Sequence, residues 1–99
     1  MFRHVVLLKF VSDATAEQRQ GVLDGLATLP GQIPELRSYL FGPDAGVNEG
    51  NFDLAVVADC DDVAAYRVYA THPAHLAVIA ERIRPILADR VAVQYVVAD

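Results

Sequence analysis

The chain opens with the run Phe2-Arg3-His4-Val5-Val6-Leu7-Leu8-Lys9-Phe10-Val11, and Thr15-Ala16-Glu17-Gln18 follows after a short break. The first run is rich in β-branched and aromatic residues, which is typical of a strand. The second has the spacing of a capping box, in which the Thr15 hydroxyl accepts from the third helical N–H and Gln18 reaches back. Apolar residues then recur at helical spacing until Pro30-Gly31. The sequence therefore predicts a strand over residues 2–11 and a helix over residues 15–29.

The rest of the sequence predicts three further strands and a second helical region. Strands are predicted over residues 36–41, 52–58 and 91–97, and the turn-forming residues 42–51 are predicted as a loop. Asp61 or Asp62 can cap a second helix that runs through Tyr69. Pro73 can begin a further helical piece, whose apolar stripe we assign to Leu76, Ile79, Ile83 and Leu87 before Pro85 kinks or tightens its last turn. The order βαββαβ predicts an α+β, ferredoxin-like fold with helices on one face of a four-stranded antiparallel sheet.

The faces of this sheet point to self-association. We assign the inward face to His4, Val6, Leu8 and Phe10 of the first strand and to Val91, Val93, Tyr95 and Val97 of the last. The outward faces, which include Ala92, Gln94 and Val96, are mixed but too apolar for free solvent. Four strands of ordinary length cover on the order of 350 Å², which is the size of patch that usually marks an interaction site. The sequence therefore predicts a homodimer in which two sheets face one another.

Composition limits the classes of function. Residues 1–99 are expected to form one domain. The chain has 54% hydrophobic and 21% charged residues, which is typical of a globular protein. The net charge of −5 argues against nucleic-acid and membrane partners. With a single cysteine, Cys60, and no export signal, a cytoplasmic location is expected. We interpret Arg82, Arg84 and Arg90 as a solvated helix face rather than an anion site, because Glu81 and Asp89 interrupt them.

Titratable groups concentrate in the segment Tyr69-Ala70-Thr71-His72-Pro73-Ala74-His75. Histidine exchanges protons near neutrality, so a phenol and an imidazole at an apolar pocket could act on a carbonyl, with Tyr69 donating to its oxygen and neutral His75 taking a proton. Two other interpretations stay open: ordinary half-buried structural side chains, or a metal site in which His4 joins His72 and His75. We expect that the protein uses no metal and no cofactor. We also expect that His72 has a structural role. The acidic neighbours of Cys60 should disfavour its thiolate.

Three motifs together resemble the stress-responsive A/B barrel domain (Dabb) family. They are His4-Val5-Val6-Leu7-Leu8-Lys9-Phe10, Leu29-Pro30-Gly31-Gln32-Ile33-Pro34 and Tyr69-x-x-His72-Pro73-x-His75. The resemblance implies a dimeric α/β barrel and, from the polyketide-cyclase branch, an aldol-type ring closure by Tyr69 and His75 beside His4. The implied pocket lies between sheet and helices, and we expect its other lining residues to be Val6, Leu8, Leu23, Leu26, Val56, Tyr66, Val78 and Ile79.

The predicted function is that of an A/B barrel protein of undetermined activity that binds a small apolar or carbonyl-containing molecule. The first alternative is a cyclase, lyase or isomerase that works without a cofactor through His75 and Tyr69. The second is a cofactor-independent monooxygenase of the dimeric-barrel kind. The geometry of His75 discriminates between them: a ring nitrogen that is open to an apolar cavity favours the enzyme, and a ring held by backbone groups with no cavity nearby does not.

Overall fold

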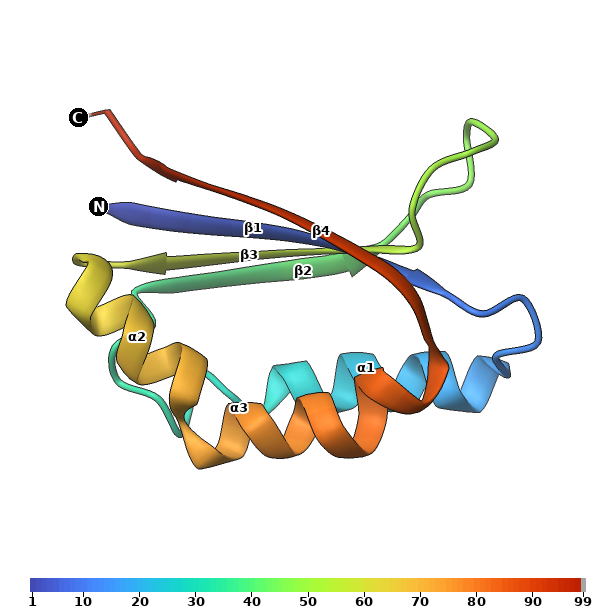
Figure 1. Ribbon diagram of the computed structural model, residues 1–99, viewed down its shortest axis with the longest axis horizontal. Helices are drawn as coiled ribbons and strands as arrows, with labels where there is room; N and C mark the ends of the chain where they lie inside the picture. Colours follow the sequence, from blue (N-terminus) through green and yellow to red (C-terminus); the bar gives the residue numbers. More distant parts are fainter. Residues whose placement is uncertain (99) are drawn as a thin grey trace.

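The computed structural model describes residues 1–98 and has two layers, a four-stranded antiparallel sheet and a layer of helices on one of its faces (Figure 1). The strand order is β2-β3-β1-β4, which is the ferredoxin-like arrangement expected from the sequence. The elements are β1 (Phe2–Phe10), α1 (Ala16–Ala27), β2 (Ser38–Pro43), β3 (Leu54–Cys60), α2 (Val63–Thr71), α3 (Pro73–Val78), the π-helical turn η1 (Ile79–Ile83), the 3₁₀ turn η2 (Arg84–Ile86) and β4 (Leu87–Val96). No helix within residues 1–98 is long and apolar enough to cross a membrane.

The first strand and helix form as predicted. The hydroxyl of Thr15 accepts from the N–H of Gln18 at 3.1 Å, and the Gln18 side chain accepts from the N–H of Thr15 at 2.8 Å. This capping box satisfies N–H groups that have no partner inside the helix. The helix then buries Val22 and Leu26 against the sheet.

The predicted bounds of β2 were wrong by two residues. We expected residues 36–41, but β2 covers Ser38–Pro43, so Gly42 and Pro43 belong to the strand and not to the loop. Leu36 instead lies in a turn, where its N–H donates to the Ile33 carbonyl. Pro43 is tolerated because β2 is an edge strand, where the missing proline N–H removes no bond to a second neighbour.

The end of the last helical stretch also differs from its prediction. The helix passes through a π-helical and then a 3₁₀ turn around Pro85, and the backbone is already extended at Leu87. Leu87 therefore starts β4 instead of ending a helical stripe, and β4 begins four residues earlier than expected. Leu76 was also assigned to that stripe, but its side chain is 49% exposed.

The core lies between the sheet and the helices. The inward face of β1 consists of His4, Val6, Leu8 and Phe10, as expected, and it packs with Leu54, Val56 and Ala58 of β3. The assignment for β4 was wrong. Arg90, Ala92 and Gln94 pair with Leu8, Val6 and His4 and so face inward, because directly opposed residues of antiparallel strands share a face.

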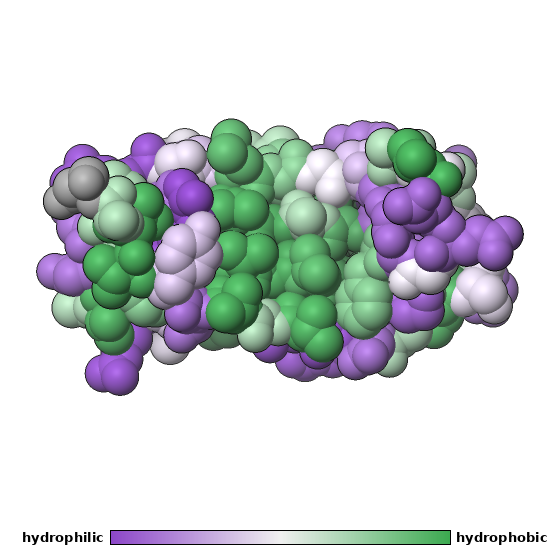
Figure 2. Space-filling model, turned by 90° about the horizontal axis from the view of Figure 1, so that it is seen from above, coloured by the Kyte–Doolittle hydropathy of each residue, from purple (hydrophilic) through white to green (hydrophobic). Residues whose placement is uncertain are grey.

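The outer face of the sheet, which the helices leave uncovered, carries exposed apolar side chains. They come from three strands: Leu40, Leu7, Val91, Val93 and Tyr95. Figure 2 shows this face from above, with an apolar band across its middle, a mostly hydrophilic right end and a left end of mixed hydropathy. Residues 44–53 form a loop that rises above this face at one end (Figure 1).

One half-buried ion pair interrupts the apolar outer face. The Arg3 guanidinium donates to both oxygens of the Asp59 carboxylate at 2.7 and 2.9 Å, and to the Tyr95 hydroxyl at 3.2 Å. The hydrogen bonds from Arg3 lower the pKa of Asp59 below its usual 3.8. An acid whose pKa is depressed in the folded state contributes stability above its unfolded pKa, and this contribution is lost as the pH falls through the folded pKa.

We therefore expect Asp59→Asn to lower the urea midpoint at pH 6, and the difference from the wild type to shrink below about pH 4. Urea unfolding at a fixed protein concentration between pH 6 and pH 2.5 measures it. Asp13→Asn is the matched control, because Asp13 is exposed and makes no ion pair within residues 1–98. A difference between Asp59→Asn and the wild type that stays constant with pH would contradict the role of the carboxylate charge.

Candidate functional site

The chain turns sharply at His72, and this turn sets the geometry of the site. Asp62 caps α2 by accepting from the N–H of Ala65 at 2.8 Å, and α2 ends where the N–H of His72 donates to the Tyr69 carbonyl. A residue before proline is held out of the helical region, and His72 is extended, with φ −62° and ψ 135°. The Nδ1 atom of His72 then accepts from the N–H of Ala74 at 3.1 Å. His72 thus caps α3, which is a structural role of the kind expected for it.

The turn brings His75 against Tyr69. Their rings stack with centroids 4.2 Å apart, and Tyr69 is only 3% exposed. The Nδ1 atom of His75 lies 3.0 Å from the carbonyl oxygen of Ala70. Because a carbonyl only accepts, Nδ1 carries the proton of the neutral ring, and Nε2 keeps a lone pair.

The Nε2 atom of His75 makes no hydrogen bond within residues 1–98, and His75 lines a cavity. No buried polar side-chain atom in this part of the chain is left without a partner, so Nε2 is not sealed in the core. Burial lowers the pKa of His75 below 6.5, although the Ala70 carbonyl opposes this effect. His75 is therefore a neutral imidazole at neutral pH, with its accepting nitrogen available.

Tyr39 of β2 is a site residue that sequence reasoning missed. Its hydroxyl lies 3.0 Å from the Tyr69 hydroxyl, and the two rings meet edge to face. Burial raises the pKa of both phenols. The pair holds two hydroxyl protons and uses one of them in the bond between the oxygens, so one proton remains for a ligand. The only signal in the sequence was the alternation in β2, which puts Tyr39 and Phe41 on one face.

His4 presents the opposite tautomer to His75. The side-chain amide N–H of Gln94 donates to Nδ1 of His4 at 3.0 Å, so neutral His4 carries its proton at Nε2. Its ring lies 5.0 Å from the ring of Tyr66. Burial, followed by the nearby charge of Arg90, lowers the pKa of His4 below 6.5. The two imidazoles thus offer one accepting and one donating Nε2.

These side chains line one cavity between the sheet and the helices, which we call the inner cavity, with a volume of about 120 Å³. Nine of the residues expected at a site line it: His4, Val6, Leu8, Leu26, Val56, Tyr66, Tyr69, His75 and Ile79. Leu23 does not line it, because it lies in a separate hollow beside Phe10 and Arg19. Val78 packs in the core and does not line it either. Tyr39, Ile83, Leu87 and Arg90 complete the lining.

The three arginines expected on one helix face lie on different elements. Arg82 donates to the Gly21 carbonyl of α1 at 2.8 Å, and Arg84 lies on the 3₁₀ turn. Arg90 lies on β4 and lines the inner cavity, because β4 begins at Leu87 and turns Arg90 inward. The interpretation of Arg90 as part of a solvated helix face was therefore wrong.

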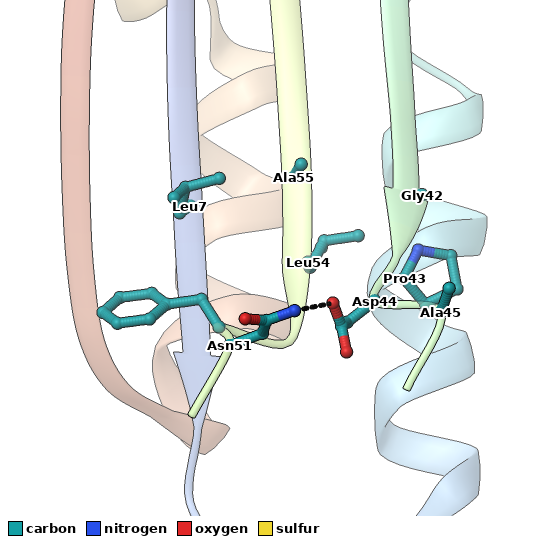
Figure 3. Close-up of a pocket in the computed structure, with 9 residues that line it drawn as sticks. Leu7, Gly42, Pro43, Asp44, Ala45, Asn51, Leu54 and Ala55 are labelled. Atoms are coloured by element: carbon teal, nitrogen blue, oxygen red, sulfur yellow. Dashed lines mark hydrogen bonds between the residues drawn. The ribbon is translucent and has the colours of Figure 1, made fainter. Parts of the chain in front are cut away.

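A second, larger hollow of about 400 Å³ lies on the outer face at the foot of the loop over residues 44–53 (Figure 3). Leu7 and Ala55 contribute from β1 and β3, and the side-chain N–H of Asn51 donates to the Asp44 carboxylate at 3.1 Å. We call it the outer hollow. It contains no imidazole, phenol or thiol, so the inner cavity is the better candidate for chemistry despite its smaller volume.

Other reactive groups lie apart from the inner cavity. Cys60 is fully buried, and burial, followed by Asp59 and Asp61, raises the pKa of its thiol. A thiol in that environment is a poor nucleophile. Within residues 1–98, no three His, Cys, Asp or Glu side chains come together as a group that could hold a metal ion.

Comparisons with known proteins agree with this architecture. The family described as Stress Responsive A/B Barrel Domain matches residues 2–97. An uncharacterized protein of Streptomyces coelicolor is 34% identical over 83 residues, which are 81% of this chain and 84% of the relative. A crystal structure from Thermobifida fusca, described as a dimeric ferredoxin-like protein of unknown function, is 46% identical with a TM-score of 0.90 over 97% of this chain and 90% of that chain. The hydroxynitrile lyase of Passiflora edulis shares the fold, with a TM-score of 0.83 and 20% identity over 99% of this chain and 94% of that chain.

Proposed function

Because this chain belongs to the stress responsive A/B barrel domain family, we propose that it acts as one domain that binds a small, largely apolar molecule in the inner cavity. The observation that carries the proposal is the division of that cavity into two kinds of wall. Val6, Leu8, Leu26 and Val56 supply an apolar wall, while the phenols and imidazoles supply hydrogen-bonding groups. An apolar cavity with a few convergent polar groups is the usual form of a small-molecule site.

A cavity-filling variant tests this binding. In NMR titrations with acetophenone and ethylbenzene, we expect shifts at residues that line the inner cavity. Val56→Phe should abolish these shifts, because the larger ring occupies the space. The matched control is Val63→Phe, since Val63 is 44% exposed on α2. Shifts that persist unchanged in Val56→Phe would place binding elsewhere.

A second candidate function is acid–base catalysis without a cofactor, of the cyclase or lyase kind. The tautomer of His75 favours it: Nδ1 is bonded to Ala70, and Nε2 is an accepting base. His75 would take a proton from the carbon next to a carbonyl group, and Tyr69, supported by Tyr39, would donate a hydrogen bond to the oxygen that becomes negative. The resulting enolate could then form or break a carbon–carbon bond.

Proton exchange tests this chemistry without a known substrate. We expect the wild type to accelerate deuterium exchange at the methyl carbon of acetophenone in D₂O. His75→Ala should reduce this acceleration by roughly 10²–10⁴-fold, and Tyr69→Phe should also reduce it. Val63→Ala is the control, because Val63 is exposed on α2 and does not line the inner cavity. The acceleration should be flat at neutral pH and fall below pH 6.5, where His75, with its lowered pKa, becomes protonated. Equal exchange in the wild type and in His75→Ala would contradict the assignment.

We also propose that two copies associate through their outer faces to close a dimeric barrel, in a cytoplasmic setting. The solved Thermobifida fusca relative is described as dimeric, which supports self-association. The exposed Val91, Val93 and Tyr95 support the outer face as the surface used. Sedimentation of the wild type at micromolar concentration tests the association, and a monomer there would contradict it.

A further inference from the structure

Arg90 places a positive charge at the rim of the inner cavity. It pairs with Leu8 across the β1–β4 ladder, and its neighbours on the same face of β4 pair with Val6 and His4. Its side chain lines the inner cavity although the residue is largely exposed, so it stands at the rim, where solvent and ligand meet.

Nothing within residues 1–98 neutralises this guanidinium. The ion pairs in that range are Arg3–Asp59, Arg19–Asp53 and Arg37–Asp61, and no side-chain hydrogen bond of Arg90 is formed. Among residues 1–98, no aspartate or glutamate lines the inner cavity. A chain with a net charge of −5 thus has a cavity whose formal charge is positive.

The other polar side chains that line the cavity are uncharged near pH 7, so Arg90 supplies the charge of the described lining. Burial lowers the pKa of both His4 and His75, and the charge of Arg90 lowers it further, so both imidazoles are neutral near pH 7. The cavity therefore combines one cation at its rim, neutral donors from His4 and the phenols, and an apolar interior.

We infer that the ligand of the inner cavity is a small monoanionic carboxylate with an apolar body, whose carboxylate pairs with Arg90. A guanidinium matches a carboxylate through two parallel N–H···O bonds. A doubly charged phosphate ester would keep one negative charge that Arg90, the cation lining the cavity within residues 1–98, does not balance. This inference rests on the proposed binding function and adds the chemical class of the ligand.

A matched pair of probes tests the charge of the ligand. Full-length protein is titrated by NMR with phenylacetate and with phenylacetamide, which differ in charge and little in shape. We expect the wild type to bind phenylacetate about tenfold more tightly than the amide. Arg90→Gln should abolish this preference, and Arg84→Gln, which alters an exposed arginine outside the cavity, should keep it.

The outcomes separate this inference from the binding function. If the amide binds in the inner cavity as tightly as phenylacetate, the binding function stands and the preference for an anion is wrong. If neither probe shifts cavity residues at millimolar concentration, both are overturned. A preference for phenylacetate that survives in Arg90→Gln also overturns the inference.

A measurement without any ligand checks the position of the charge. NMR titration of the imidazoles should give a higher pKa for His4 and for His75 in Arg90→Gln than in the wild type, because the nearby cation that lowers both is removed. Arg84→Gln should leave both values unchanged. Imidazole titrations that do not respond to Arg90→Gln would mean that the guanidinium does not act on the cavity, and would overturn the inference.

Discussion

Replacing Leu29 by Ala should lower the free energy of unfolding by about 3 kcal/mol, within the roughly 2–5 kcal/mol typical of buried leucines. Leu29 is fully buried just beyond the end of α1, in the core between sheet and helices. The shorter side chain loses apolar contact and leaves a cavity that a close-packed interior cannot fill. Leu29 does not line the inner cavity, so ligand binding should be retained.

Urea unfolding at a fixed protein concentration measures this change, since the midpoint of a self-associating protein depends on concentration. The slope of the transition should stay constant, because the surface exposed on unfolding hardly changes. Leu76→Ala is the matched control: the chemistry is the same, but Leu76 is 49% exposed on α3, so its effect should be small. A similar loss in both variants would mean that burial at Leu29 is not what stabilises the fold.

Val93→Glu should abolish the proposed self-association and leave a monomer at micromolar concentration. Val93 pairs with Val5 near the middle of the outer face and is 59% exposed, so the substitution should leave the single-chain fold intact. In a pair of facing sheets, the same position would be covered, and an unpaired carboxylate there would be strongly unfavourable.

Sedimentation of the wild type and the variant, with circular dichroism to check the fold, measures the effect. Val63→Glu is the control, because Val63 lies on α2, away from the outer face, with a similar exposure of 44%. If Val93→Glu sediments as the wild type does, the association uses another surface. If Val63→Glu also dissociates, the effect is not specific to the outer face.

Local signals in the sequence were sufficient to predict most of the fold. The capping box at Thr15 and the proline at 73 act over three or four residues, so they could be recognised without tertiary contacts. The faces of β4 could not be assigned in this way. Val91, Val93 and Tyr95 alternate like core residues, but the outer face is apolar as well, so alternation alone did not tell which side faces the helices.

The candidate site was predictable where its residues are close in sequence. Tyr69 and His75 come together because one proline forces a turn between them. Tyr39 lies thirty residues before Tyr69 in the sequence, and the two hydroxyls meet only because the chain folds β2 next to α2. No local sequence pattern predicts that contact. Arg90 was missed for a related reason: its inward direction depends on where β4 begins and on its pairing with β1.

The loop over residues 44–53 limits what can cover the outer face. It rises above the sheet at one end, beside the outer hollow (Figures 1 and 3). A flat surface, such as a lipid bilayer, would meet the loop before it reached the apolar band. A second copy turned by 180° about an axis across the strands would place its own loop at the opposite end. In that orientation each loop would flank the partner's sheet, whereas rotation about an axis along the strands would place both loops at the same end. The shape of one loop thus favours one orientation of the pair.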